Sequence, residues 1–224
     1  MTAPTEHTTE PHSLRVGIFM LVVAVVQGFD LILDGRIDHF TREDGREFRD
    51  LASFAGDSAS VICLILLVIL AAVLIRDRRP LTRESTPRGV LVTMIVFLGA
   101  ASLNVLMNIA TLVVSPSLKG ASQTELIVDL MLLFASTTLI FSLWYQLADV
   151  YLPGGAFEFP ENAAHPGQAP RWFDYLSLSF YTNSTFGPTL ESVKTRPAKA
   201  LMMTQTSLSL VVLVVLIARI IRGI

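Results

Sequence analysis

Five apolar segments, each long enough to cross a lipid bilayer, constrain this sequence more than any other feature. The hydrocarbon core of a bilayer is about 30 Å thick, so a spanning helix needs roughly 20 mostly apolar residues. The segments cover residues 16–33, 58–75, 89–118, 126–148 and 200–218. Because lipid offers the backbone no hydrogen-bond partners, and no strand-like alternation is present, all five are expected to be helices. The predicted fold class is an all-α, multi-pass membrane protein with five transmembrane helices.

The composition agrees with a membrane environment. Charged residues make up only 16% of the chain, against about 25% in a typical soluble domain. A net charge of −2 gives no basic face, so we expect the lipid bilayer and no nucleic acid as a partner. The single cysteine, Cys63, excludes both a disulfide framework and a cysteine-based zinc site.

The order of the segments predicts three regions. Residues 1–13 are polar and form an expected disordered tail; 14–120 form a three-helix membrane region; 121–224 hold a helix, a long loop and the final helix. The tail has no lysine or arginine, so it does not resemble a secretory signal. The basic residues are mostly arginine, as in many GC-rich bacteria, and we expect a bacterial inner (cell) membrane. The positive-inside rule leaves the orientation open, because the two arrangements have nearly equal charge counts.

A short apolar stretch before the last helix provides the functional clue. Residues 172–181 are apolar and aromatic, and as a helix they would be about 15 Å long, half the membrane thickness. Such a half-helix either lies at the interface or enters the membrane and turns back. A polar run, 182–189, follows it. This order is that of a re-entrant pore loop, whose half-helix would turn its negative end toward the membrane centre and favour a cation. An interfacial helix with an ordinary loop fits the same order.

The polar run resembles the pore region of the two-transmembrane potassium-channel superfamily, whose filter reads T-x-x-T-x-G-Y-G. Thr182, Thr185 and Gly187 match both threonines and the first glycine. The resemblance covers residues 126–223 and implies an outer helix, a pore helix, a filter and an inner helix. It also implies a homotetrameric, passive ion channel for monovalent cations. The candidate ion-pathway residues are Thr182, Ser184, Thr185, Phe186 and Gly187.

The filter departs from the family pattern in its outer half. Pro188 stands in place of the tyrosine, Thr189 in place of the second glycine and Leu190 in place of the acid. Proline fixes φ near −65° and has no N–H, so this half differs from the standard filter. The resemblance therefore leaves the choice between K⁺ and Na⁺ open.

A second resemblance supports the architecture without a chemistry. The region is similar to the C-terminal half of a family of uncharacterised bacterial multi-pass inner-membrane proteins. The residues that carry this resemblance are Tyr151, Gly154, Gly155, Phe159, Pro160, Asp174 and Tyr175. It keeps a non-conducting scaffold or accessory protein open as the alternative function. A small transporter is less favoured, because the five segments show no inverted repeat.

Several polar residues fall within the apolar segments. Asp30 lies near the end of the first segment and Asp129 near the start of the fourth; Asn104 and Asn108 lie four apart on the third. Ionisable groups in a bilayer are costly, so they face a bundle interior, a water path or the headgroups. For Asp129 we favour the headgroup position over a water path. The two asparagines share one helix face and are expected to join two helices by hydrogen bonds.

The remaining signals argue against catalysis. The sequence has no nucleophile elbow, no His-Glu-x-x-His motif and no glycine-rich phosphate loop after a strand. Its histidines lie outside the predicted helices and lack metal-ligand spacing. We expect no enzyme activity, no cofactor and no metal site. The aromatic residues at the ends of the segments are expected to form an interfacial belt: Trp144, Tyr145, Tyr151 and Trp172.

Overall fold

The computed structural model describes residues 14–41, 61–73, 81–114, 123–160, 169–184 and 191–222. Within these ranges the chain is mostly helical, with one pair of two-residue strands and short connecting turns. The helices are α1 (Val16–Thr41), α3 (Arg88–Val114), α4 (Gln123–Tyr151), α6 (Trp172–Asn183) and α7 (Arg196–Arg222), with a shorter apolar helix, Val61–Val73. Strands β1 (Phe157–Glu158) and β2 (Ser192–Val193) pair antiparallel. The all-α prediction is confirmed.

Four helices are long and apolar enough to cross a membrane: α1, α3, α4 and α7. The apolar segment at 58–75 contains the helix Val61–Val73, which is shorter than a span. The rest of that segment lies outside the described residues, as does the N-terminal tail, 1–13. The half-helix expected at 172–181 is present as α6, which continues through Thr182 to Asn183.

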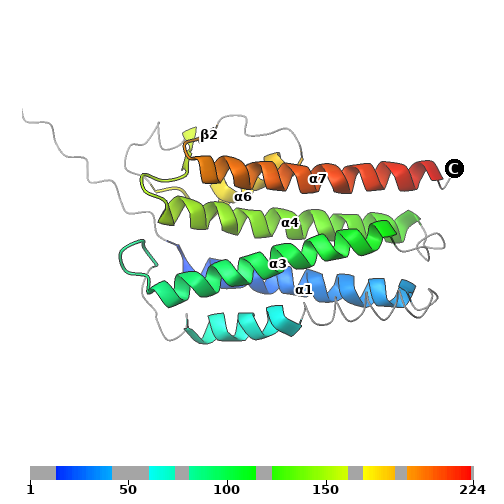
Figure 1. Ribbon diagram of the computed structural model, residues 1–224, viewed down its shortest axis with the longest axis horizontal. Helices are drawn as coiled ribbons and strands as arrows, with labels where there is room; N and C mark the ends of the chain where they lie inside the picture. Colours follow the sequence, from blue (N-terminus) through cyan, green and yellow to red (C-terminus); the bar gives the residue numbers. More distant parts are fainter. Residues whose placement is uncertain are drawn as a thin grey trace, which may run out of the picture.

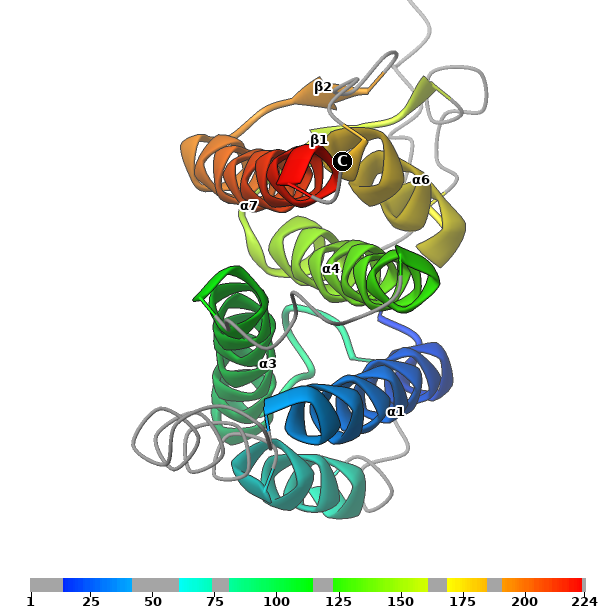
Figure 2. The same cartoon turned by 90° about the vertical axis from the view of Figure 1, so that its right-hand side faces the viewer.

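Helix α4 lies at the centre of the molecule. It packs against α1 and α3 on one side and against α6 and α7 on the other (Figure 2). Helices α1 and α3 run in the same direction, and α4 runs opposite to them (Figure 1). A backbone bridge joins the starts of α1 and α3, where the Leu14 N–H donates to the Leu81 carbonyl at 2.9 Å. Both halves of the chain therefore meet on α4.

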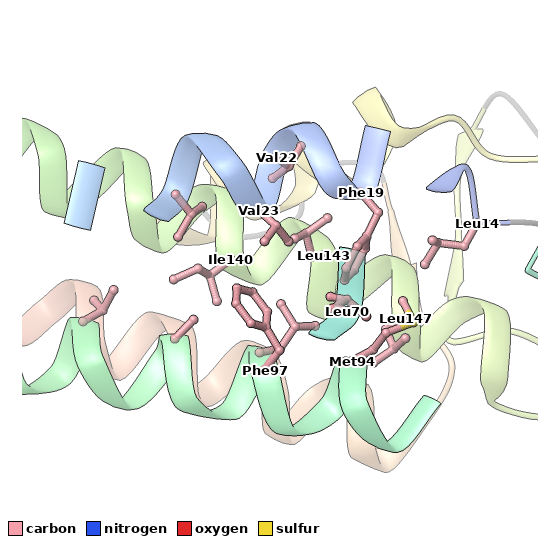
Figure 3. Close-up of a cluster of buried hydrophobic side chains, with 14 of the residues drawn as sticks. Leu14, Phe19, Val22, Val23, Leu70, Met94, Phe97, Ile140, Leu143 and Leu147 are labelled. Carbon is pink, nitrogen blue, oxygen red and sulfur yellow. The ribbon is translucent and has the colours of Figure 1, made fainter. Parts of the chain in front are cut away.

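An apolar core joins α1, α3 and α4 to the helix Val61–Val73. Figure 3 shows its centre, where side chains of α1 and α4 face those of α3. Its labelled members are Leu14, Phe19, Val22, Val23, Leu70, Met94, Phe97, Ile140, Leu143 and Leu147. A methylene buried here gains about 0.8 kcal/mol when the alternative is water, whereas in lipid the gain comes from packing alone.

The outer surface of the helices is also apolar. Met131, Leu21 and Leu103 are 66%, 65% and 58% exposed. Contiguous exposure of this kind along four long helices is unfavourable in water and natural in a bilayer. The molecule therefore has the surface of a membrane protein.

The turn after α4 brings the chain back toward the start of α6. Gly154 and Gly155 adopt φ values of +78° and +74°, a left-handed conformation that costs glycine little. At the start of α6, the Asp174 carboxylate accepts the Arg171 N–H at 2.7 Å and caps the helix.

Candidate functional site

The candidate ion-pathway residues lie at and beyond the C-terminal end of α6. Thr182 is buried in the last helical turn rather than in a polar turn after the helix, which corrects the sequence prediction. Its hydroxyl donates to the Leu178 carbonyl at 2.8 Å. The Ser184 hydroxyl donates to the Phe180 carbonyl at 2.8 Å. Thr185, Phe186 and Gly187 lie outside the described residues.

Helix α6 is amphipathic in the inverse sense to a helix of a soluble protein. Its buried face, at the spacing i, i+3, i+4 and i+7, carries polar groups: Tyr175, Ser179, Thr182 and the adjacent Asn183 are all buried, with Leu178 among them. Its outer face is aromatic, with Phe173 66% and Phe180 49% exposed. The sequence therefore directs the polar side of the half-helix into the bundle, between α4 and α7.

Gln205 of α7 connects three helices. Its side chain is fully buried, and its Nε2 donates to the carbonyl and to the hydroxyl of Ser179, both at 2.9 Å. Its Oε1 accepts the hydroxyl of Tyr145 from α4. The Ser179 hydroxyl in turn donates to the Thr138 carbonyl at 2.7 Å. This chain of bonds fixes the depth of α6 against both neighbours.

Asn183 holds the end of α6. Its Nδ2 donates to the Phe134 carbonyl at 3.0 Å and to the Thr138 hydroxyl at 2.8 Å, and its Oδ1 accepts the Ser209 hydroxyl. At 1.5 Å per residue, Ser209 lies about 20 Å along α7 from Arg196. The end of α6 therefore lies about halfway along α7. We use the name inner polar network for Thr138, Tyr145, Ser179, Asn183, Gln205 and Ser209.

Asp149 fixes the opposite end of α6. Its Oδ1 accepts the N–H groups of Ala156 and Phe157 at 2.6 and 3.0 Å. Its Oδ2 accepts the Tyr175 hydroxyl at 2.6 Å. Burial, together with the negative charge of Asp149, raises the pKa of Tyr175 above its ordinary value near 10, so the phenol remains a donor. One carboxylate thus orders the turn, β1 and α6.

Asn104 and Asn108 both contact Asp30. Asn108 Nδ2 donates to Asp30 Oδ1 at 3.1 Å, and Asn104 Nδ2 donates to Asp30 Oδ2. All three side chains are buried. The asparagines were expected to bond to a second helix. That helix is α1, and the partner group is the carboxylate of Asp30.

Asp129 is 1% exposed and forms an ion pair with Arg36 at the end of α1. Arg36 also donates to the Glu125 carbonyl at 3.2 Å. The carboxylate is thus enclosed between α1 and α4 near the ends of both candidate spans, and the headgroup position favoured for Asp129 stays a prediction. Asp129 lies about 14 Å along α4 from the network residue Thr138, toward the start of that helix.

Sequence reasoning misplaced Tyr145 and missed the role of Gln205. Tyr145 is fully buried and bonded to Gln205, so it does not belong to an aromatic belt. The sequence feature that could have indicated the role of Gln205 is its spacing from Ser209. The two polar residues are four apart in the last apolar segment and lie on one helix face. Trp144 also bonds inward, to the Ser102 hydroxyl at 3.1 Å.

Comparison with known proteins found that no family model, no curated protein and no solved structure matches this chain. Within the described residues, no group of three or more His, Cys, Asp and Glu side chains is arranged to hold a metal ion. The buried polar groups there are amides, hydroxyls and carboxylates, whose chemistry is hydrogen bonding and the binding of protons or cations.

Proposed function

We propose that this protein is a passive pore for monovalent cations in a cell membrane, with α4 as the outer helix, α6 as a re-entrant half-helix and α7 as the inner helix. The observation that carries the proposal is the position of the end of α6. Asn183 bonds to α4 at Phe134 and Thr138 and to α7 at Ser209, about halfway along α7. The C-terminus of a helix has a partial negative charge, which favours a cation at that depth.

The direction of α1 and α3 supports five crossings rather than four. Both helices start at the end of the bundle where Leu14 meets Leu81. Since α1 runs away from this end, the chain has to return along the bundle before α3 begins. The apolar helix Val61–Val73 lies in this return. We assign the fifth span to the segment at 58–75.

Four copies of the chain would surround one ion path, because a single loop cannot enclose an ion. In the spanning window of α7 only 17% of the residues are buried, against 50% in α4. Thr204 and Ser207 are exposed on α7, and hydroxyls facing lipid are less favourable than hydroxyls facing a neighbouring subunit or water. We therefore assign the exposed face of α7 to the axis of a homotetramer.

The proposed ion path begins with Ser184, just after α6, and continues in sequence through Thr185, Phe186 and Gly187; Thr182, two residues earlier, is buried in the last turn of α6. Gly187 is the residue of this run that adopts unusual backbone dihedrals at the least cost, which carbonyl-lined filters require. Both K⁺ and Na⁺ are candidate ions.

Ion flux into liposomes tests the proposal. Purified protein should pass K⁺ or Na⁺; Asn183→Leu, which releases the end of α6, and Gly187→Ala should abolish or alter the flux while circular dichroism shows intact helices. Thr93→Ala is the matched control, because within the described part of the chain that exposed hydroxyl bonds only to the Gly89 carbonyl of its own helix. Absence of flux for both ions from folded wild-type protein, or a monomeric state in mild detergent, would contradict the pore and favour a non-conducting scaffold or accessory protein.

A further inference from the structure

The two carboxylates buried between the spanning helices have different partners. Asp129 has a cationic partner, Arg36. Asp30 is 8% exposed and is bonded only to amides; within the described ranges it contacts no lysine, arginine or histidine. A carboxylate enclosed in an apolar bundle without a counter-charge is strongly unfavourable in its ionised form. Asp30 therefore needs a neutralising species that Asp129 does not.

One atom of the Asn104 amide lacks a hydrogen-bond partner among the described residues, and a proton on Asp30 would provide one. Its Nδ2 donates to Asp30 Oδ2, which suits an ionised carboxylate. Its Oδ1 is buried and has no hydrogen-bond partner among the described residues, although the residue is fully enclosed. A half turn of the amide exchanges the two atoms. In the turned state, Oδ1 accepts an O–H from protonated Asp30.

We propose that Asp30, Asn104 and Asn108 form an intramembrane proton-binding site. A proton from water adds to Asp30 Oδ2, the carboxylate becomes a neutral carboxylic acid, and the Asn104 amide turns from donor to acceptor. Release returns the proton to water, and no other bond is made or broken. Asn108 keeps Asp30 Oδ1 in place in both states through its 3.1 Å bond. This site lies between α1 and α3 and does not depend on conduction through α6 and α7.

Among the residues that the structure describes, the neighbours of Asp30 supply no positive charge. On α1 they are Asp34 and Gln27, whose Nε2 also has no partner among the described residues. On the helix Val61–Val73 the buried thiol of Cys63 lies within electrostatic range of both Asp30 and Asp34. Helix α3 presents the two amides, and on α4 the buried carboxylate of Asp129 is already paired. A proton is the species that neutralises Asp30 without further ligands.

Infrared difference spectroscopy of the full chain in liposomes tests the site. Lowering the pH should produce the carbonyl band of a protonated, buried carboxylic acid. The near-isosteric Asp30→Asn variant should lose this band, and Asp129→Asn, the matched control, should retain it. A band that persists in Asp30→Asn, or wild-type protein that shows no such band over the whole pH range in which it stays folded, would overturn the proposal.

A second variant, Asn104→Leu, tests the site even if Asp30→Asn does not fold. Asn104→Leu retains the carboxyl group and removes the amide that responds to it, so the band should remain but shift in frequency. An unshifted band would exclude the role of Asn104. A band that responds to sodium concentration at fixed pH would assign the site to a metal cation and overturn the proton assignment.

Discussion

At the scale of single residues, three buried carboxylates of this bundle bond to groups outside their own helices. Asp129 is paired with a guanidinium, Asp30 with two amides, and Asp149 with a phenol and two backbone N–H groups. Breaking such a pair from one side leaves the other group buried and unsatisfied. The cost of that is larger than the net stabilisation by the intact pair.

We expect Arg36→Leu to destabilise the protein by about 2–3 kcal/mol, somewhat below the usual cost for a fully buried pair because Arg36 is 30% exposed. The reason is the buried carboxylate of Asp129, which loses its counter-charge. The double variant Arg36→Leu/Asp129→Leu should recover most of the loss. Thermal unfolding in detergent measures both; equal stabilities of the single and double variants would contradict the ion pair.

The two glycines after α4 provide a matched pair. Gly154→Ala and Gly155→Ala both place a side chain at positive φ, which costs about 1 kcal/mol each. A Cβ at Gly155 would also lie 3.0 Å from Asp149 Oδ1, whereas at Gly154 nothing lies within 4 Å. Gly155→Ala should therefore lower the unfolding temperature more than Gly154→Ala. The reverse order would show that Asp149 does not hold the turn.

At the scale of elements, α6 is positioned by polar contacts on its inner face rather than by length. Twelve residues are too few to span a bilayer. The inner polar network holds the C-terminal half of α6 against α4 and α7, and Asp149 holds its N-terminal half. Without these hydrogen bonds, no specific interaction would fix the depth of an apolar half-helix.

We expect Gln205→Leu to loosen α6 selectively. The change removes two donors to Ser179 and leaves the Tyr145 hydroxyl buried without its acceptor, at a cost of about 1–2 kcal/mol. Hydrogen exchange should become faster in α6 and stay unchanged in α3.

Thr93→Val is the control for this measurement, because among the described residues its hydroxyl bonds only to the Gly89 carbonyl one turn earlier. Equal exchange rates for α6 in Gln205→Leu and in wild-type protein would contradict the role assigned to the inner polar network.

At the scale of the whole molecule, α4 joins two halves of different character (Figure 2). Its contacts with α1 and α3 are mainly apolar, and those with α6 and α7 include the inner polar network. The N-terminal half is thus a bundle around an apolar core, and in the C-terminal half α6 packs against α4 and α7. The directions in which the helices run predict on which sides of the membrane the two termini lie.

We expect reporters fused to the two termini to be active on opposite sides of the membrane, with the C-terminus in the cytoplasm. Helix α1 starts and α7 ends at opposite ends of the bundle (Figure 1). The five crossings that we propose would separate the termini, and four would place them on the same side. Reporters active on the same side would therefore contradict the fifth span at 58–75, and a C-terminal reporter active only outside would contradict the channel orientation.

The sequence by itself determined the helices of this protein, and the tertiary structure decided which of their faces meet. Apolar length and the need to satisfy the backbone internally predicted α1, α3, α4 and α7, and the short stretch before the last of them predicted α6. In lipid, however, both the inner and the outer face of a helix are apolar, so periodicity carries little information on which face is buried. The pairing of Asp30 with Asn104, of Arg36 with Asp129 and of Tyr145 with Gln205 joins residues 60 to 93 positions apart. Such pairs form only when the helices are packed, because the two partners lie on different helices and far apart in the sequence.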